Sequence, residues 1–156
     1  GNIGDKLVSE LSKKVEALKV GPGMEDGVRM GSLVHSSHRD DVLSLLEKGL
    51  NHGGKVVLGG NALPGDGAFM AATVVVDVEM DNPLFTEELF GPVLAVSKFS
   101  EDKEALKMAQ AWDFVEAKPD KLLTELTETG GGFSGGQMQR LAMPFFPTDD
   151  YCIVVD

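Results

Sequence analysis

Cysteine is nearly absent from this chain of 156 residues, in which Cys152 is the one example. A single cysteine excludes an internal disulfide framework and a zinc site built from several thiolates. We therefore expect a reducing, cytoplasmic location. The cysteine content by itself indicates no particular function.

Basic residues are also scarce, because 14 Lys and Arg face 25 Asp and Glu, for a formal net charge of −11. Nucleic acids and anionic membranes bind clusters of Lys and Arg, so we expect neither as a partner. Long apolar runs are missing too, and the longest, residues 71–76, is far too short to span a bilayer. The N-terminal residues lack the pattern of a signal peptide. We predict a soluble protein without membrane insertion.

Helices and strands are expected to alternate through the first hundred residues. Residues 4–19 and 37–50 carry apolar side chains at helical spacing, and glycine-containing turns end both segments. Residues 55–58, 69–78 and 92–99 predict short strands, of which 69–78 is rich in β-branched residues. The alternation predicts an α/β fold, with helices packed on a small, mostly parallel sheet. Only two or three strands have strong support, so the sheet is expected to be incomplete.

Beyond the third expected strand the character of the chain changes. Residues 101–116 have a helical pattern, whereas residues 130–136 contain five glycines in seven positions and predict a flexible loop. Residues 151–155 predict a short apolar strand. We therefore divide the chain into two units, residues 1–104 and residues 105–156.

The most informative segment is a heptad, residues 87–93, which reads Glu-Glu-Leu-Phe-Gly-Pro-Val. It resembles the Glu-Glu-Ile-Phe-Gly-Pro-Val signature of the aldehyde dehydrogenase superfamily. Residues 17–21, residues 30–33 and the two strands before the heptad follow the same family in order and spacing. The resemblance covers about residues 5–105 and implies the C-terminal part of an aldehyde dehydrogenase catalytic domain, incomplete relative to the parent fold.

The same resemblance implies a role for two residues of the heptad. Glu88 matches the family's glutamate that accepts hydrogen bonds from the nicotinamide ribose, and Phe90 matches the aromatic residue that packs beside the nicotinamide. A carboxylate suits a vicinal diol, and an aromatic face suits a flat heterocycle. The expected cofactor is therefore NAD or NADP. Without the family pattern, Glu88 would be a solvated carboxylate and Phe90 a core residue.

No catalytic residue of that family is expected in this chain. The family uses a nucleophilic cysteine, a glutamate base, an oxyanion donor and a Rossmann loop, all upstream of the matching segment. Cys152 follows the heptad, so its position does not match that cysteine. Ser32 and Ala72 also stand where the family usually has proline. We expect a family fragment that is inactive alone and binds NAD or NADP weakly at most.

The tail carries a second resemblance. Residues 133–141 read Phe-Ser-Gly-Gly-Gln-Met-Gln-Arg-Leu and resemble the Leu-Ser-Gly-Gly-Gln signature of ATP-binding cassette ATPases. Residues 152–156 resemble the apolar strand and aspartate of a Walker B motif. In residues 49–56, the closest stretch to a Walker A motif, valine replaces the Ser or Thr that binds Mg²⁺, so ATP hydrolysis is not expected. The resemblance implies an alternative nucleotide-binding set: Ser134, Gly135, Gly136, Gln137 and Asp156.

Two histidines, His35 and His38, lie three residues apart at the start of the second expected helix, where Ser36 or Ser37 is the expected N-cap. Such a pair suits a metal ion only with further ligands. No third Cys, His or carboxylate follows at a suitable spacing. We therefore predict no metal site.

Three functional interpretations stay open: a nicotinamide-cofactor-binding fragment, a nucleotide-binding fragment of a transporter ATPase, and a globular chimera that binds no ligand. In the parent family this segment packs against further strands and helices. Residues 71–78 are therefore expected to form an exposed apolar edge, and we expect self-association through exposed strand edges.

Overall fold

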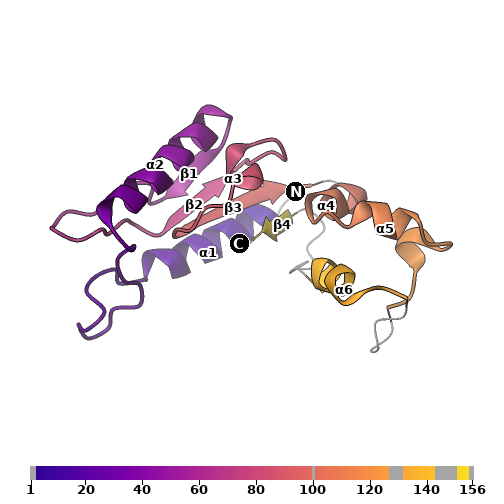
Figure 1. Ribbon diagram of the computed structural model, residues 1–156, viewed down its shortest axis with the longest axis horizontal. Helices are drawn as coiled ribbons and strands as arrows, with labels where there is room; N and C mark the ends of the chain where they lie inside the picture. Colours follow the sequence, from indigo (N-terminus) through magenta and orange to yellow (C-terminus); the bar gives the residue numbers. More distant parts are fainter. Residues whose placement is uncertain (1–2, 100, 127–131, 143–150, 155–156) are drawn as a thin grey trace.

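The N-terminal two thirds of the chain form two long helices and, between them, three strands of a sheet that a strand from the C-terminal part completes (Figure 1). A computed structural model describes residues 3–99, 101–126, 132–142 and 151–154. None of the described helices combines the length and the apolar character needed to cross a bilayer. The principal elements are the helices α1 (Ile3–Glu16) and α2 (Ser36–Asn51) and the strands β1 (Lys55–Leu58), β2 (Thr73–Val76), β3 (Val93–Lys98) and β4 (Tyr151–Val154).

The sheet has the order β1-β2-β3-β4, and its strands run in mixed directions. The α/β class, with helices packed on a small sheet, is confirmed. The expectation of a mostly parallel sheet is wrong, because only β2 and β3 are parallel, and β1 and β4 each pair antiparallel with their neighbour. A parallel pair needs a crossover connection, and the segment between β2 and β3, which contains a short helix, is that connection.

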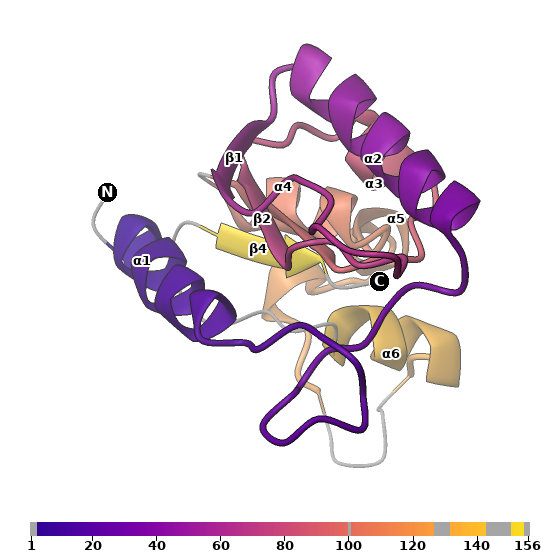
Figure 2. The same ribbon diagram turned by 90° about the vertical axis from the view of Figure 1, so that its left-hand side faces the viewer.

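The sheet is the middle of three layers, as Figure 2 shows. Side chains alternate between its faces along each strand. Val74 and Val96 face α1, whereas Val75 and Ala95 pack with Leu46 of α2. The two central strands are therefore buried on both faces, which explains the near-continuous apolar sequence of β2.

The prediction that residues 71–78 form an exposed edge is wrong. β2 lies between β1 and β3, and Val74 and Val75 are fully buried, with 0% exposure. In the described sheet β1, and not β2, lies at the edge, and its Val57 is 45% exposed. The strands β1 and β3 thus cover the apolar surface that the sequence suggested would be open.

The connection between β2 and β3 is organised by Asn82, which has 0% exposure. Its Oδ1 accepts the backbone N–H of Leu84 at 2.9 Å and so caps α3 (Pro83–Thr86). Its Nδ2 donates to the carbonyl oxygen of Gly49, in the last turn of α2, at 2.8 Å. One buried amide therefore forms a hydrogen bond with a backbone group of each helix. These two bonds hold the segment that leads into the heptad against the end of α2.

The remaining helices lie beyond one end of the sheet (Figure 1). They are α4 (Asp102–Met108), α5 (Trp112–Glu116), a short 3-10 turn (Lys121–Leu123) and α6 (Gly135–Ala142). An apolar cluster joins α4 and α5 to Phe133 and Leu141. The helix expected over residues 101–116 is broken at Gln110, whose φ of 50° is left-handed and incompatible with a continuous helix. The proposed division at residue 104 stays a prediction.

Replacing Asn82 should destabilise the fold strongly. Asn82→Ala removes the cap of α3 and one donor to the buried carbonyl of Gly49, which also accepts from the N–H groups of His52 and Gly54, so we expect a loss of about 1–3 kcal/mol of unfolding free energy. Urea unfolding followed by circular dichroism measures this loss. The control is Asn61→Ala, since the exposed Asn61 side chain donates only to its neighbour Ala62. Equal effects of the two substitutions would contradict the role of Asn82.

Candidate functional site

The heptad runs from the end of α3 to the first residue of β3. Glu88 is exposed, and Phe90 is 67% exposed although its neighbours Leu89 and Gly91 are partly buried. The alternative interpretation of Phe90 as a core residue is therefore wrong. The loop places both cofactor-binding candidates at the surface.

A pocket of about 340 Å³ lies between residues 87–90 of the heptad and α2. On the helix side it is lined by side chains about one turn apart, including His38, Asp41, Leu45 and Lys48. On the other side it is lined by residues 87–90, so Glu88 and Phe90 belong to one site. Its size suits a sugar or a single ring system, and its lining is largely polar and charged.

His38 connects the helix side of this pocket to the loop side. Its Nε2 lies 2.7 Å from the carbonyl oxygen of Phe90. Because a carbonyl oxygen only accepts, His38 must carry a proton on Nε2 and donate it. Sequence reasoning considered His38 only as a metal ligand, since nothing in the sequence connects residues 38 and 90.

The loop also approaches α2 closely at Gly91. A Cβ atom at this position would lie 2.8 Å from Cγ1 of Val42, a distance that real side chains do not adopt. Val42 is itself buried in α2. The glycine of the heptad is therefore required because its backbone lies against the buried Val42 side chain, and not only for chain flexibility.

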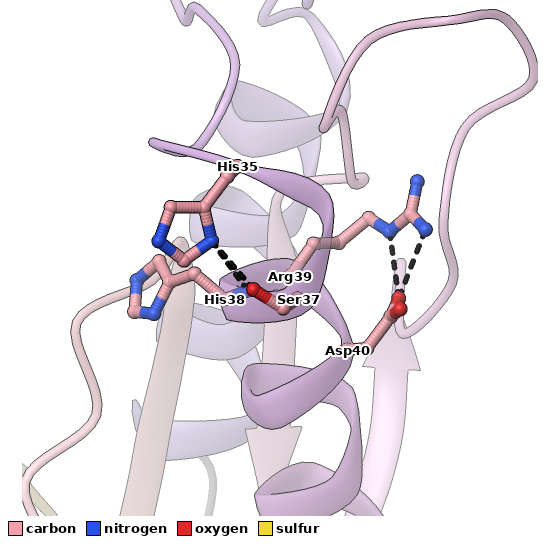
Figure 3. Close-up of polar contacts among 5 residues, drawn as sticks. All are labelled: His35, Ser37, His38, Arg39 and Asp40. Carbon is pink, nitrogen blue, oxygen red and sulfur yellow. Dashed lines mark hydrogen bonds and ion pairs between the residues drawn. The ribbon is translucent and has the colours of Figure 1, made fainter.

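The first turn of α2 is capped by His35, as Figure 3 shows. Its Nδ1 accepts the backbone N–H of His38 at 3.1 Å and lies 2.8 Å from the Ser37 hydroxyl, which must donate to it. The prediction of Ser36 or Ser37 as N-cap is wrong, because the helix already begins at Ser36 and places both serines in its first turn. Histidine is not a usual capping residue, so composition pointed to the serines.

The two histidine rings form an edge-to-face pair, with centroids 6.1 Å apart. His35 uses Nδ1 as a cap and His38 uses Nε2 on the loop, so each has a structural partner. Within the described ranges, no group of three or more His, Cys, Asp or Glu side chains is placed to hold a metal ion.

The four described residues of the alternative nucleotide-binding set lie together at the start of α6. Ser134 Oγ accepts from the N–H of Gln137 at 3.2 Å, and Gln137 Oε1 accepts from the N–H of Ser134 at 2.8 Å. This reciprocal pair is a capping box. Gly135 and Gly136 are exposed, and Asp156 lies outside the described residues. None of the four lines the pocket at the heptad.

Comparison with known proteins identifies the family. The family model described as "Aldehyde dehydrogenase family" matches residues 1–117. The chain belongs to the aldehyde dehydrogenase family. The match contains the whole heptad and the pocket beside it, and it extends beyond residue 105, where the resemblance was expected to end. The resemblance of the tail to cassette ATPases stays a prediction.

Individual aldehyde dehydrogenases agree with this assignment. A mitochondrial aldehyde dehydrogenase from Leishmania tarentolae is 40% identical over 108 residues, which are 69% of this chain and 22% of the relative. The structure of lactaldehyde dehydrogenase from Escherichia coli superposes with a TM-score of 0.65 at 32% identity, covering 68% of this chain and 22% of that one. A betaine aldehyde dehydrogenase from Staphylococcus aureus, solved with NAD⁺, gives 0.63 at 26% identity and covers 69% and 22%. The chain thus spans about a fifth of the length of these relatives.

Replacement of His35 tests the cap of α2. His35→Leu removes the acceptor and should cost about 1 kcal/mol of unfolding free energy, whereas His35→Asn keeps an acceptor and should stay within about 0.5 kcal/mol of the parent chain. Urea unfolding of the two variants side by side measures the difference. If His35→Asn were as unstable as His35→Leu, the imidazole acceptor would not be what holds the turn.

Proposed function

We propose that this chain forms part of the cofactor-binding surface of an NAD(P)-dependent aldehyde dehydrogenase. In this proposal Glu88 accepts hydrogen bonds from the nicotinamide ribose hydroxyls, and Phe90 packs against the nicotinamide side. The observation that carries the proposal is the joint exposure of the two side chains beside one pocket. It is supported by the family membership of residues 1–117 and by the NAD⁺ bound to the Staphylococcus aureus relative.

The physical chemistry of the loop favours a flat, polar ligand. An exposed phenylalanine ring gains free energy when another apolar surface covers it. An exposed carboxylate beside it can accept from two hydroxyl groups without first losing a protein partner. Together they suit a sugar joined to an aromatic heterocycle. Because the pocket holds only part of a dinucleotide, we expect a dissociation constant on the order of millimolar for NAD⁺.

We also propose that the polypeptide of 156 residues does not oxidise aldehydes by itself. Its one cysteine, Cys152, lies in β4 opposite Ser97 of β3. The proposed cofactor contacts lie instead on the pocket between α2 and the heptad. An aldehyde held beside a cofactor at that pocket would need a nucleophile from elsewhere.

Binding of NAD⁺ is the direct test. Glu88→Gln and Phe90→Ala should each weaken binding about threefold to tenfold, without changing the melting temperature, because both side chains are exposed. An NMR chemical-shift titration measures the affinity. The matched controls are Glu47→Gln, an exposed carboxylate of α2 outside the pocket, and Leu123→Ala, an exposed apolar side chain. Equal binding by all four variants would refute the assignment of the two residues.

The same titration with ATP separates the alternative interpretation. A nucleotide-binding role of the tail predicts that ATP, and not NAD⁺, shifts resonances of residues 134–137. Ser134→Ala should then weaken the response to ATP. A chain whose resonances ignore both nucleotides would be a globular protein without either ligand.

A second proposal concerns association between copies, which we assign to β1. This strand lies at one end of the described sheet, and a pocket of about 560 Å³ opens between α1 and the sheet beside Val57. A strand at the end of a sheet offers unpaired backbone groups to another chain. Lys55 and the irregular register near Val56 weaken this tendency, so the association should be weak.

Sedimentation velocity at increasing concentration measures this association. Val57→Lys should keep the chain monomeric, because a charge would lie where a second copy must pack. Val34→Lys is the control, since Val34 is also exposed but lies in the loop before α2. A parent chain that stays monomeric at millimolar concentration would rule out the proposal.

A further inference from the structure

A hydrogen bond joins the first turn of α2 to the backbone of the heptad across 52 residues of sequence. We propose that His38 is a positioning residue, which holds the Phe90 backbone so that the phenyl ring meets a nicotinamide ring. This inference rests on the proposed function of Glu88 and Phe90. It adds a residue of the same pocket, which acts through its hydrogen bond to the Phe90 backbone.

The orientation of the Phe90 ring depends mainly on the position of its backbone. With 67% of its surface exposed, the ring receives little support from neighbouring side chains. Its carbonyl oxygen, however, accepts from Nε2 of His38 at 2.7 Å. Fixing that carbonyl fixes the peptide plane after residue 90 and so restricts the directions in which the side chain can leave the backbone.

His38 is itself held firmly. Its backbone N–H donates to Nδ1 of His35, so the cap of α2 and the anchor of the loop belong to one helical turn. At the other end of the connection, Asn82 joins α3 to Gly49 in the last turn of α2. The segment between Asn82 and Phe90 is thus attached to both ends of the same helix.

The loop has other attachments that do not involve His38. The carbonyl oxygen of Pro92 accepts the N–H of Thr73 at 2.8 Å, and Gly91 lies against Val42. Loss of the His38 hydrogen bond should therefore leave the chain folded while loosening residues 88–91. A change confined to residues 88–91 would distinguish a positioning role of His38 from a general contribution to stability.

The experiment compares His38→Leu, which removes the donor, with His38→Gln, whose amide donates at a similar reach. Amide hydrogen exchange is measured by NMR at Gly91 and Val93, which donate to Leu89 and Gly91, without cofactor. NAD⁺ affinity is then measured by titration. His52→Leu is the control, because His52 is an exposed histidine at the other end of α2.

We expect His38→Leu to speed exchange at the two amides about fivefold to tenfold and to weaken NAD⁺ binding by a similar factor. His38→Gln and His52→Leu should stay within about twofold of the parent chain in both measurements. Exchange elsewhere in the sheet should not change.

Three results would overturn the proposal: unchanged exchange in His38→Leu, failure of His38→Gln to restore slow exchange, or faster exchange throughout the chain. The third would mark His38 as a general stabiliser. If the two loop amides respond as expected but the parent chain binds no NAD⁺, the positioning of the loop is supported and the cofactor function fails.

Discussion

The architecture around the candidate site depends on the close contact between α2 and the segment that links β2 to β3. Two glycines make this contact possible, one on each side. A Cβ at Gly49 would lie 2.4 Å from Cγ of Leu84, and one at Gly91 would lie 2.8 Å from Cγ1 of Val42. Asn82 then satisfies the polar groups that this approach buries. A buried polar network of this kind stabilises a fold only when every member finds its partner.

Such anchoring explains how an exposed loop can present a defined surface. Glu88 and Phe90 gain little from the core, yet the backbone that carries them is attached to a helix at both ends. A site whose backbone is ordered before binding loses less conformational freedom when a ligand arrives. The arrangement therefore suits recognition of a ligand through few contacts.

Much of the local structure could be predicted from the sequence. The two long helices, the first three strands and the α/β class follow from apolar periodicity, which is a local property. The heptad, together with residues 17–21, residues 30–33 and the two strands before it, indicated the aldehyde dehydrogenase family, because their order and spacing resemble that family's pattern. The two site residues could be named for the same reason, although their cofactor contacts remain proposals. The break at Gln110 was missed, since a single left-handed residue leaves no trace in the periodicity.

By itself, then, the sequence determined the elements, the family and the segment that carries the candidate site. Tertiary structure alone decided the strand directions, the burial of β2 between two neighbours, the cap at His35 and the hydrogen bond from His38 to Phe90. The physical reason is the distance along the sequence over which each kind of interaction acts. Propensity and periodicity act over a few residues, whereas strand order and a contact between residues 38 and 90 depend on how whole layers pack against each other.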